Sequence, residues 1–158
     1  MPSHIVVIAA SYPQHLVIAI EHGFWDFTRR RDVHTGDDVY FWIAGSGLAA
    51  HVRASSDTRA LHAEDTPWED SGERSYTHRL QFTVVSDSPR SNPTWTEMQT
   101  GAGTRRIASN GFVTIPDEGS AWLAAVFSTP RIDQVFGREV VTDLSSLRAT
   151  TREDERSR

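Results

Sequence analysis

The sequence predicts a single α+β domain, in which a small, curved or closed β-barrel of about five or six short strands is flanked by helices. Three observations lead to this fold class. Short β-branched segments alternate with turns, helical spacing is confined to a few segments, and a chain of 158 residues suits one hydrophobic core rather than two. Because short strands need closure to hide their edges, the sheet is expected to curl.

The N-terminal segment predicts a buried strand followed by a short helix. Residues His4–Ala10 are continuously apolar and rich in β-branched side chains, which is typical of a strand inside a sheet. Helical spacing then covers Pro13–His22, with Ser11 or Tyr12 as the expected N-cap and Gly23 as the stop. Strand and helix together form the first part of the predicted domain.

Three strands are expected in the middle of the chain. A Gly-Asp turn precedes the strand Val39–Ile43, and a Gly-Ser-Gly turn separates it from a return strand over Leu48–Ser55. The stretch YTHRLQFTVVSD, residues 76–87, alternates an apolar face containing Leu80 with a polar face containing Arg79. This alternation predicts a half-buried strand.

The C-terminal part predicts a short strand over Gly111–Ile115 and an amphipathic helix over Asp117–Phe127, which begins with acidic residues. Pattern is lost from about residue 142. Residues 1–141 are therefore assigned to the domain, and residues 142–158 to a polar, disordered tail.

Composition excludes several kinds of chemistry. Without cysteine there are no disulfides, thiolate zinc sites or cysteine nucleophiles, and without lysine there is no Schiff base or P-loop lysine. The formal charge of −5 argues against a protein that grips long duplexes mainly by neutralising phosphates. The seven histidines form no HExxH motif, and the paired acids Asp37-Asp38 and Glu69-Asp70 are assigned to solvated surface. No metal, cofactor or catalytic residue is predicted, and the protein is expected not to be an enzyme.

The apolar run IVVIAA is too short to span a bilayer, and no charged region with a cleavage site precedes it. A cytoplasmic protein with no membrane partner is therefore expected.

Several motifs occur in a characteristic order. Ser11-Tyr12 follows the first strand, Gly23 and Trp25 close the helix, and Ser46-Gly47 ends a later strand. In this order, over roughly Ile5 to Phe127, they resemble the YTH family of the PUA-like superfamily. The stretch GDDVYFW is similar to the EVE family of the same superfamily. The residues leave the choice between the EVE and YTH types open.

The resemblance implies a small barrel that reads a modified base in an aromatic pocket. Trp25 matches one wall of the YTH cage, and Trp68, in the polar loop of residues 57–75, is expected to form the second wall. Stacking of a base on such a ring is worth about 1–3 kcal/mol. The side chains expected to hydrogen-bond the base edge are Ser11, Tyr12, His15 and Asp26. The run Arg29, Arg30 and Arg31 follows Trp25 and is expected to bind a flanking phosphate.

Aromatic residues in a small barrel are also often core. Trp42 in a strand and Trp122 on an amphipathic helix are assigned to the core, and Trp95 is left open. For Trp25, packing between the helix and the next strand is as compatible with the sequence as a role in the cage wall. For Trp68, a place in the core is the alternative to the cage wall.

The function implied is a reader of methylated or hydroxymethylated cytosine, or of N6-methyladenine, with the base flipped or single-stranded. DNA in a restriction or defence setting is favoured over RNA, and a nuclease partner is compatible with this setting. The alternatives are a YTH-like RNA reader of N6-methyladenine and a protein-interaction domain with no nucleic-acid site. An ASCH-type amidohydrolase on the same fold is expected to use a lysine, which this chain lacks.

Overall fold

The computed structural model describes residues 2–62, 65–104, 107 and 111–128, and the backbone of residues 137–138 and 140–141. The chain divides into two compact units, Met1–Phe127 and Ser128–Arg158. In the second unit, the short strands β8 (Gly137–Arg138) and β9 (Val140–Val141) pair in parallel. The predicted tail, residues 142–158, lies outside the described residues.

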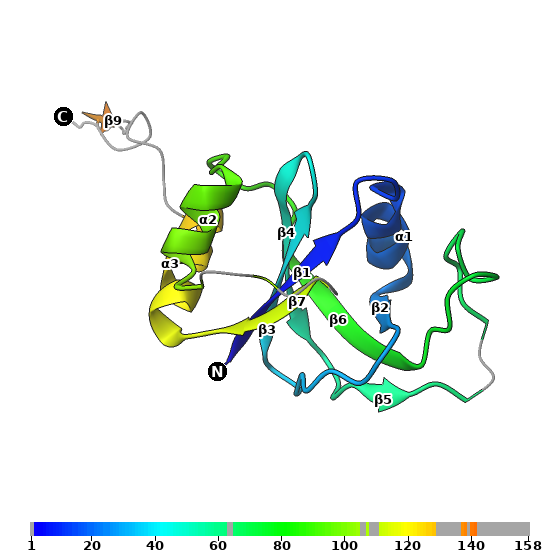
Figure 1. Ribbon diagram of the computed structural model, residues 1–158. Helices are drawn as coiled ribbons and strands as arrows, with labels where there is room; N and C mark the ends of the chain where they lie inside the picture. The colour runs from blue at the N-terminus through cyan, green and yellow to red at the C-terminus, as the bar shows by residue number, and fades with distance from the viewer. Residues whose placement is uncertain are drawn as a thin grey trace. The chain divides into compact units, whose positions relative to one another are not determined.

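The first unit is built on one mixed sheet of seven strands (Figure 1). Its order is β2-β6-β4-β3-β1-β7, and the short β5 also pairs with β6. Strands β1 and β3 are parallel, and the other neighbouring pairs are antiparallel. The strands are β1 (Ser3–Ile8), β2 (Phe24–Phe27), β3 (Asp38–Ile43), β4 (Gly47–Ala54), β5 (Arg59–Ala60), β6 (His78–Ser86) and β7 (Phe112–Ile115).

The predicted α+β class with a curved sheet is confirmed. The sheet curls as an open half-barrel: its end strands β2 and β7 do not pair, but the rings of Phe27 and Phe112 on them meet at a centroid distance of 5.7 Å. The pairing of β3 with β4 skips Ala49, and the pairing of β4 with β6 skips Val85, so each of β4 and β6 carries an extra residue that locally bends it. Sequence patterning missed two strands, β2 and β5. Both are short, with four and two residues, and both pair with β6.

Three helices accompany the sheet: α1 (Gln14–His22), α2 (Trp95–Gly101) and α3 (Asp117–Ser128). Helix α1 ends as predicted at Gly23, whose φ of 76° suits glycine and whose N–H donates to the carbonyl of Ala19. Its N-cap is Pro13 rather than the expected Ser11 or Tyr12, and no side chain caps this end. The unpredicted α2 begins at a Thr94–Glu97 capping box.

Alternate residues of β1 pack into two separate cores. Val6 and Ile8 belong to the core that contains Trp68, whereas Ile5 belongs to the core that contains Trp42. Val7 packs at the border of this second core, which also receives α2 and α3. The period of two in a strand explains this division. The core assignment of Trp42 is confirmed, and the half-buried Trp122 packs against the same cluster.

Candidate functional site

A hollow of about 680 Å³ lies at the C-terminal end of β1. It is lined by the end of β1, the start of α1, β2 and the loop before β6. Five of the six side chains predicted for the base pocket border it: Ser11, Tyr12, His15, Trp25 and Asp26. Residues distant in sequence are thus brought together where the motifs placed them.

Trp25 forms one wall of this hollow from β2, where it pairs with Leu80 of β6. Its half-buried ring meets the edge of Phe41 at a centroid distance of 5.2 Å and leans on Trp68 at the same distance. The buried rings of Phe41 and Trp68 therefore pack against the Trp25 indole and support it. Trp25 is both packed and accessible, as a stacking platform requires.

Trp68 lies in the core and does not form the expected second wall. Its side chain is only 4% exposed, and its Nε1 donates a 3.0 Å hydrogen bond to Oδ2 of Asp26. A base between two rings would need about 7 Å, twice a normal contact of ~3.5 Å, but Trp25 and Trp68 touch at 5.2 Å with a 56° tilt. The polar loop misled the prediction, because a buried carboxylate satisfies the one polar group of the indole.

Asp26 is also placed differently from the expectation. Its buried carboxylate accepts hydrogen bonds at 2.7 and 2.9 Å from Arg79, in addition to the bond from Trp68. The Arg79 guanidinium lies 3.6 Å from the ring centroid of Phe24 and is buried, although the alternation of β6 predicted it on the polar face. Asp26 thus holds Trp68 and Arg79 in place beside the hollow that it lines, and its role in reading a base edge stays a prediction.

His15 borders the hollow with a nearly buried side chain. The side chain is 5% exposed, and its ring stacks on Tyr12 with centroids 4.8 Å apart and an 11° interplanar angle. Nε2 is buried and makes no hydrogen bond within the described residues. Burial lowers the pKa of His15, against an opposing effect of Asp70 and Glu69, so the imidazole is neutral at neutral pH. Ser11 is exposed at the border of the same hollow.

The loop before β6 adds four lining residues that the sequence did not assign to the pocket: Asp70, Arg74, Ser75 and Tyr76. The Tyr76 hydroxyl donates to Asp70 at 2.7 Å, and Arg74 lies 3.5 Å from the other carboxylate oxygen. Burial, followed by the bond to Asp70, raises the pKa of Tyr76. Asp70 was assigned to the surface but is buried, because this tyrosine and arginine surround its carboxylate.

Asp37 was likewise assigned to solvent and is buried. It accepts a 2.9 Å hydrogen bond from His4 Nε2, while His4 Nδ1 lies 2.9 Å from the Thr114 hydroxyl. Periodicity cannot find such pairs, since the partners are remote in sequence.

The three arginines after Trp25 adopt two environments. Arg29 and Arg30 are exposed, whereas Arg31 is half-buried with its guanidinium 4.9 Å from the ring centroid of Phe112. Burial, and the neighbouring Arg29, lower the pKa of Arg31. None of the three lines the hollow, but Thr28, which precedes them, does.

Within the described ranges there is no group of three histidine, aspartate or glutamate side chains that would hold a metal ion. In the same part of the chain, no helix is long and apolar enough to cross a membrane.

No protein-family model matches the chain, and no curated protein sequence matches it. Solved structures do resemble it. The Pho92 YTH domain in complex with m6A is 16% identical with a TM-score of 0.54, and the match covers 83% of this chain and 87% of that one. The Mmi1 YTH domain is 11% identical with a TM-score of 0.52, covering 78% and 94%. A ZmASCH protein from Zymomonas mobilis is 8% identical with a TM-score of 0.53, covering 81% and 100%.

At these identities the likenesses concern the fold. They confirm the predicted resemblance to YTH domains and the α+β half-barrel architecture.

Proposed function

We propose that this chain reads a modified base of single-stranded RNA, N6-methyladenine above others, in the hollow beside Trp25, and that it does so without catalysis. The fold neighbours support RNA over the DNA expected from sequence, because the Pho92 domain was solved with m6A and an Mmi1 domain, at a TM-score of 0.50, with RNA. Neither DNA, a restriction or defence setting, nor a nuclease partner finds such support.

One observation carries the proposal: an accessible tryptophan borders the same hollow as a buried histidine nitrogen that has no hydrogen-bond partner among the described residues. A base stacked on Trp25 would gain about 1–3 kcal/mol. The neutral His15 would hydrogen-bond the base edge, donating from Nε2 to a ring nitrogen in one tautomer or accepting from an exocyclic N–H in the other. Satisfying that nitrogen removes the cost of a buried, unpaired polar atom.

Methyl selection would come from the apolar part of the hollow. Val6, Ile8 and Ala9 line it together with Trp25, and a methyl group placed against them leaves water. Burial of one such group is worth about 0.8 kcal/mol, and a closed fit adds packing contacts. The preference expected from burial alone is therefore about fourfold, and a closer fit raises it.

The resemblance of the fold to ZmASCH leaves an enzyme as the competing function. The chain has no lysine, which the ASCH-type amidohydrolases are expected to use, so hydrolysis of that kind is disfavoured.

A matched set of labelled single-stranded oligonucleotides tests the proposal. RNA and DNA of one sequence, each with adenine, N6-methyladenine, cytosine or 5-methylcytosine at one position, are titrated and followed by fluorescence anisotropy. N6-methyladenine RNA should bind most tightly. Equal affinity for all members would contradict a modified-base reader, and a preference confined to DNA would restore the DNA interpretation.

A further inference from the structure

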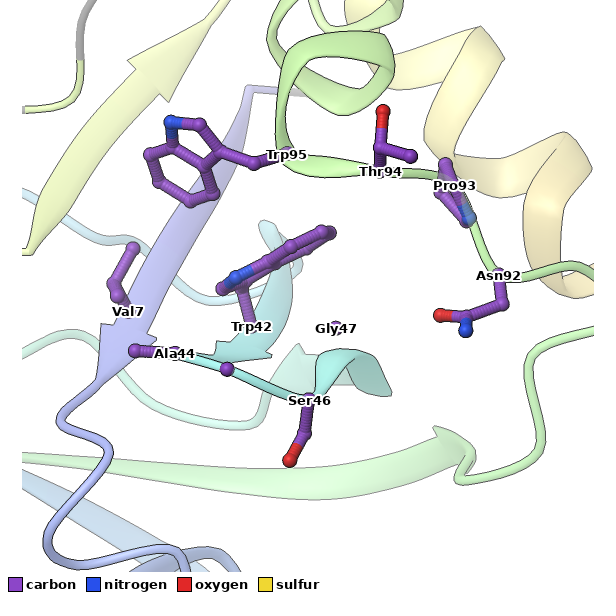
Figure 2. Close-up of a pocket in the computed structure, with 10 residues that line it drawn as sticks. Val7, Trp42, Ala44, Ser46, Gly47, Asn92, Pro93, Thr94 and Trp95 are labelled. Atoms are coloured by element: carbon purple, nitrogen blue, oxygen red, sulfur yellow. The ribbon is translucent and has the colours of Figure 1, made fainter.

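A second hollow, of about 570 Å³, lies near the same end of β1 (Figure 2). It is lined by Val7, Trp42, the turn of residues 44–47 and the segment of residues 92–95 that leads into α2. Its volume falls in the range of about 300–1,000 Å³ that is usual for small-ligand sites. None of the residues predicted for the base pocket borders it.

Two tryptophans give this hollow aromatic walls. The rings of Trp42 and Trp95 meet at a centroid distance of 5.3 Å and an angle of 66°. Trp42 is buried, but Trp95 is 38% exposed, which is high for a large aromatic side chain. An edge-on contact of this kind leaves ring surface of Trp95 uncovered, so a flat ligand would have a face on which to stack.

The rest of the lining offers an open floor and an amide. A side chain at Gly45, where φ is 83°, would meet no atom within 4 Å, so backbone is open to close approach there. Across the hollow, the Asn92 side chain points toward Gly47 (Figure 2), and its Oδ1 would lie 2.7 Å from a Cβ at that glycine. Asn92 is exposed at the border of this hollow, and its amide offers both donors and an acceptor.

Val7 connects this hollow with the one beside Trp25, because it lines both. Its neighbours Val6 and Ile8 belong to the core of Trp68, and Val7 packs on the core of Trp42. The two hollows therefore lie on opposite faces of the sheet at the end of one strand. A single-stranded chain that crosses this end would reach both.

We propose that the hollow of Trp42 and Trp95 is a second base site, which takes an unmodified base of the same RNA strand whose modified base occupies the hollow of Trp25. Trp95 is the stacking platform, and Asn92 hydrogen-bonds the base edge. This inference rests on the proposed function. A nucleobase suits the hollow because it combines a flat apolar face with a polar edge, which matches an exposed indole beside an exposed amide.

The test compares two ligands: N6-methyladenosine alone, and RNA of about ten nucleotides with one N6-methyladenine, within the ~4–16 nucleotides that a small barrel covers. Trp95→Ala should weaken RNA binding about 5- to 150-fold, which corresponds to the 1–3 kcal/mol of one stacked base. Its affinity for the nucleoside should not change. Trp25→Ala should lower the affinity for both ligands. Thr96→Ala, an exposed neighbour that does not line this hollow, is the matched control.

Two further measurements keep the test decisive if Trp95→Ala loses structure. The first measurement uses two milder variants. Trp95→Leu retains apolar packing on Trp42 but lacks the ring, and Asn92→Ala removes only the amide. Each should lower the affinity for RNA without changing the affinity for the nucleoside. The second measurement is an NMR titration of the wild-type protein with unlabelled RNA or with the nucleoside. The indole N–H resonances of Trp42 and Trp95 should shift with RNA but not with the nucleoside.

Wild-type affinity for RNA in Trp95→Leu and Asn92→Ala, or unmoved Trp95 resonances, would overturn the second site. Movement of these resonances by an apolar peptide but not by RNA would overturn it in favour of a protein partner. Equal wild-type affinity for modified and unmodified RNA, with Trp95 still required, would overturn the proposed modification reading while the second site stands.

Discussion

The Trp68 indole donates a 3.0 Å hydrogen bond to the buried carboxylate of Asp26, which is also bound by Arg79. This contact ties the loop before β6 to the two paired strands β2 and β6. Trp25 precedes Asp26 on β2 and leans on the Trp68 ring, so the buried contact fixes the wall of the hollow. We therefore expect substitutions at Asp26 to affect mainly the stability of the fold, and substitutions at the neighbouring Trp25 to affect mainly binding.

Asp26→Asn should destabilise the fold strongly. The substitution leaves the buried Arg79 charge without its carboxylate, and loss of one partner of a buried ion pair costs about 3–5 kcal/mol. Urea denaturation measures the free energy of unfolding. Asp87→Asn, at an exposed site, is the control and should change it by less than about 0.5 kcal/mol. Similar small effects of both substitutions would contradict the structural role of Asp26.

Trp68→Ala should behave as a core substitution, with a loss of about 3–5 kcal/mol in the free energy of unfolding. Trp68→Phe should retain most of the packing and lose chiefly the bond to the Asp26 carboxylate, and a hydrogen bond to a charged group is worth about 1.5–3 kcal/mol. Thermal melts of both variants provide the measurement. If Trp68→Ala melted like the wild type and lost only base binding, Trp68 would be a cage wall after all.

The free energy of unfolding should depend on His15 in mildly acidic solution. Because burial lowers its pKa below the ordinary ~6.5, the unfolded chain takes up a proton more readily than the folded one. Stability is thus complete above about pH 6.5 and falls as the pH drops from there toward the lowered folded value. His15→Gln should show a shallower loss over this window. Parallel pH profiles for wild type and variant would contradict a buried neutral His15.

Arg29→Ala and Arg30→Ala should weaken all RNA ligands about equally, since phosphate contacts position a strand without selecting its bases. Each lost contact should also reduce the slope of log affinity against log salt by about 0.7. Arg31→Ala should in addition lower the melting temperature, because its guanidinium packs on Phe112. A collapse of the modified-to-unmodified ratio, with unchanged salt dependence, would show that these residues have another role.

Local patterns were sufficient to predict most of the fold. The strand Ser3–Ile8 and the helices Gln14–His22 and Asp117–Ser128 follow runs and spacings that their own residues specify. Helix Trp95–Gly101 was missed although its Thr-x-x-Glu start is a capping signal, because it is short and follows two prolines. The two-residue strand Arg59–Ala60 depends on its partner β6 and leaves no pattern of its own.

The hollow was only partly predictable, for a different reason. Family-like spacing placed Ser11, Tyr12, His15 and Trp25 around it, but the state of each polar group depends on partners far away in sequence. Asp26 meets Arg79 across 53 positions, and no periodicity announces such a pair. The same holds for Trp68, whose polar loop gave no sign of the buried carboxylate beneath it.

The central claim, that the hollow beside Trp25 selects a methylated base, is tested most directly by the ratio of affinities for N6-methyladenosine and adenosine. Isothermal titration of the wild type should give a ratio above about four, the value expected from burial of one methyl group. Trp25→Ala should lose about 1–3 kcal/mol of binding free energy for the modified nucleoside and remain folded, as its thermal melt would show. A wild-type ratio near one, or undiminished binding by a folded Trp25→Ala, would contradict the claim.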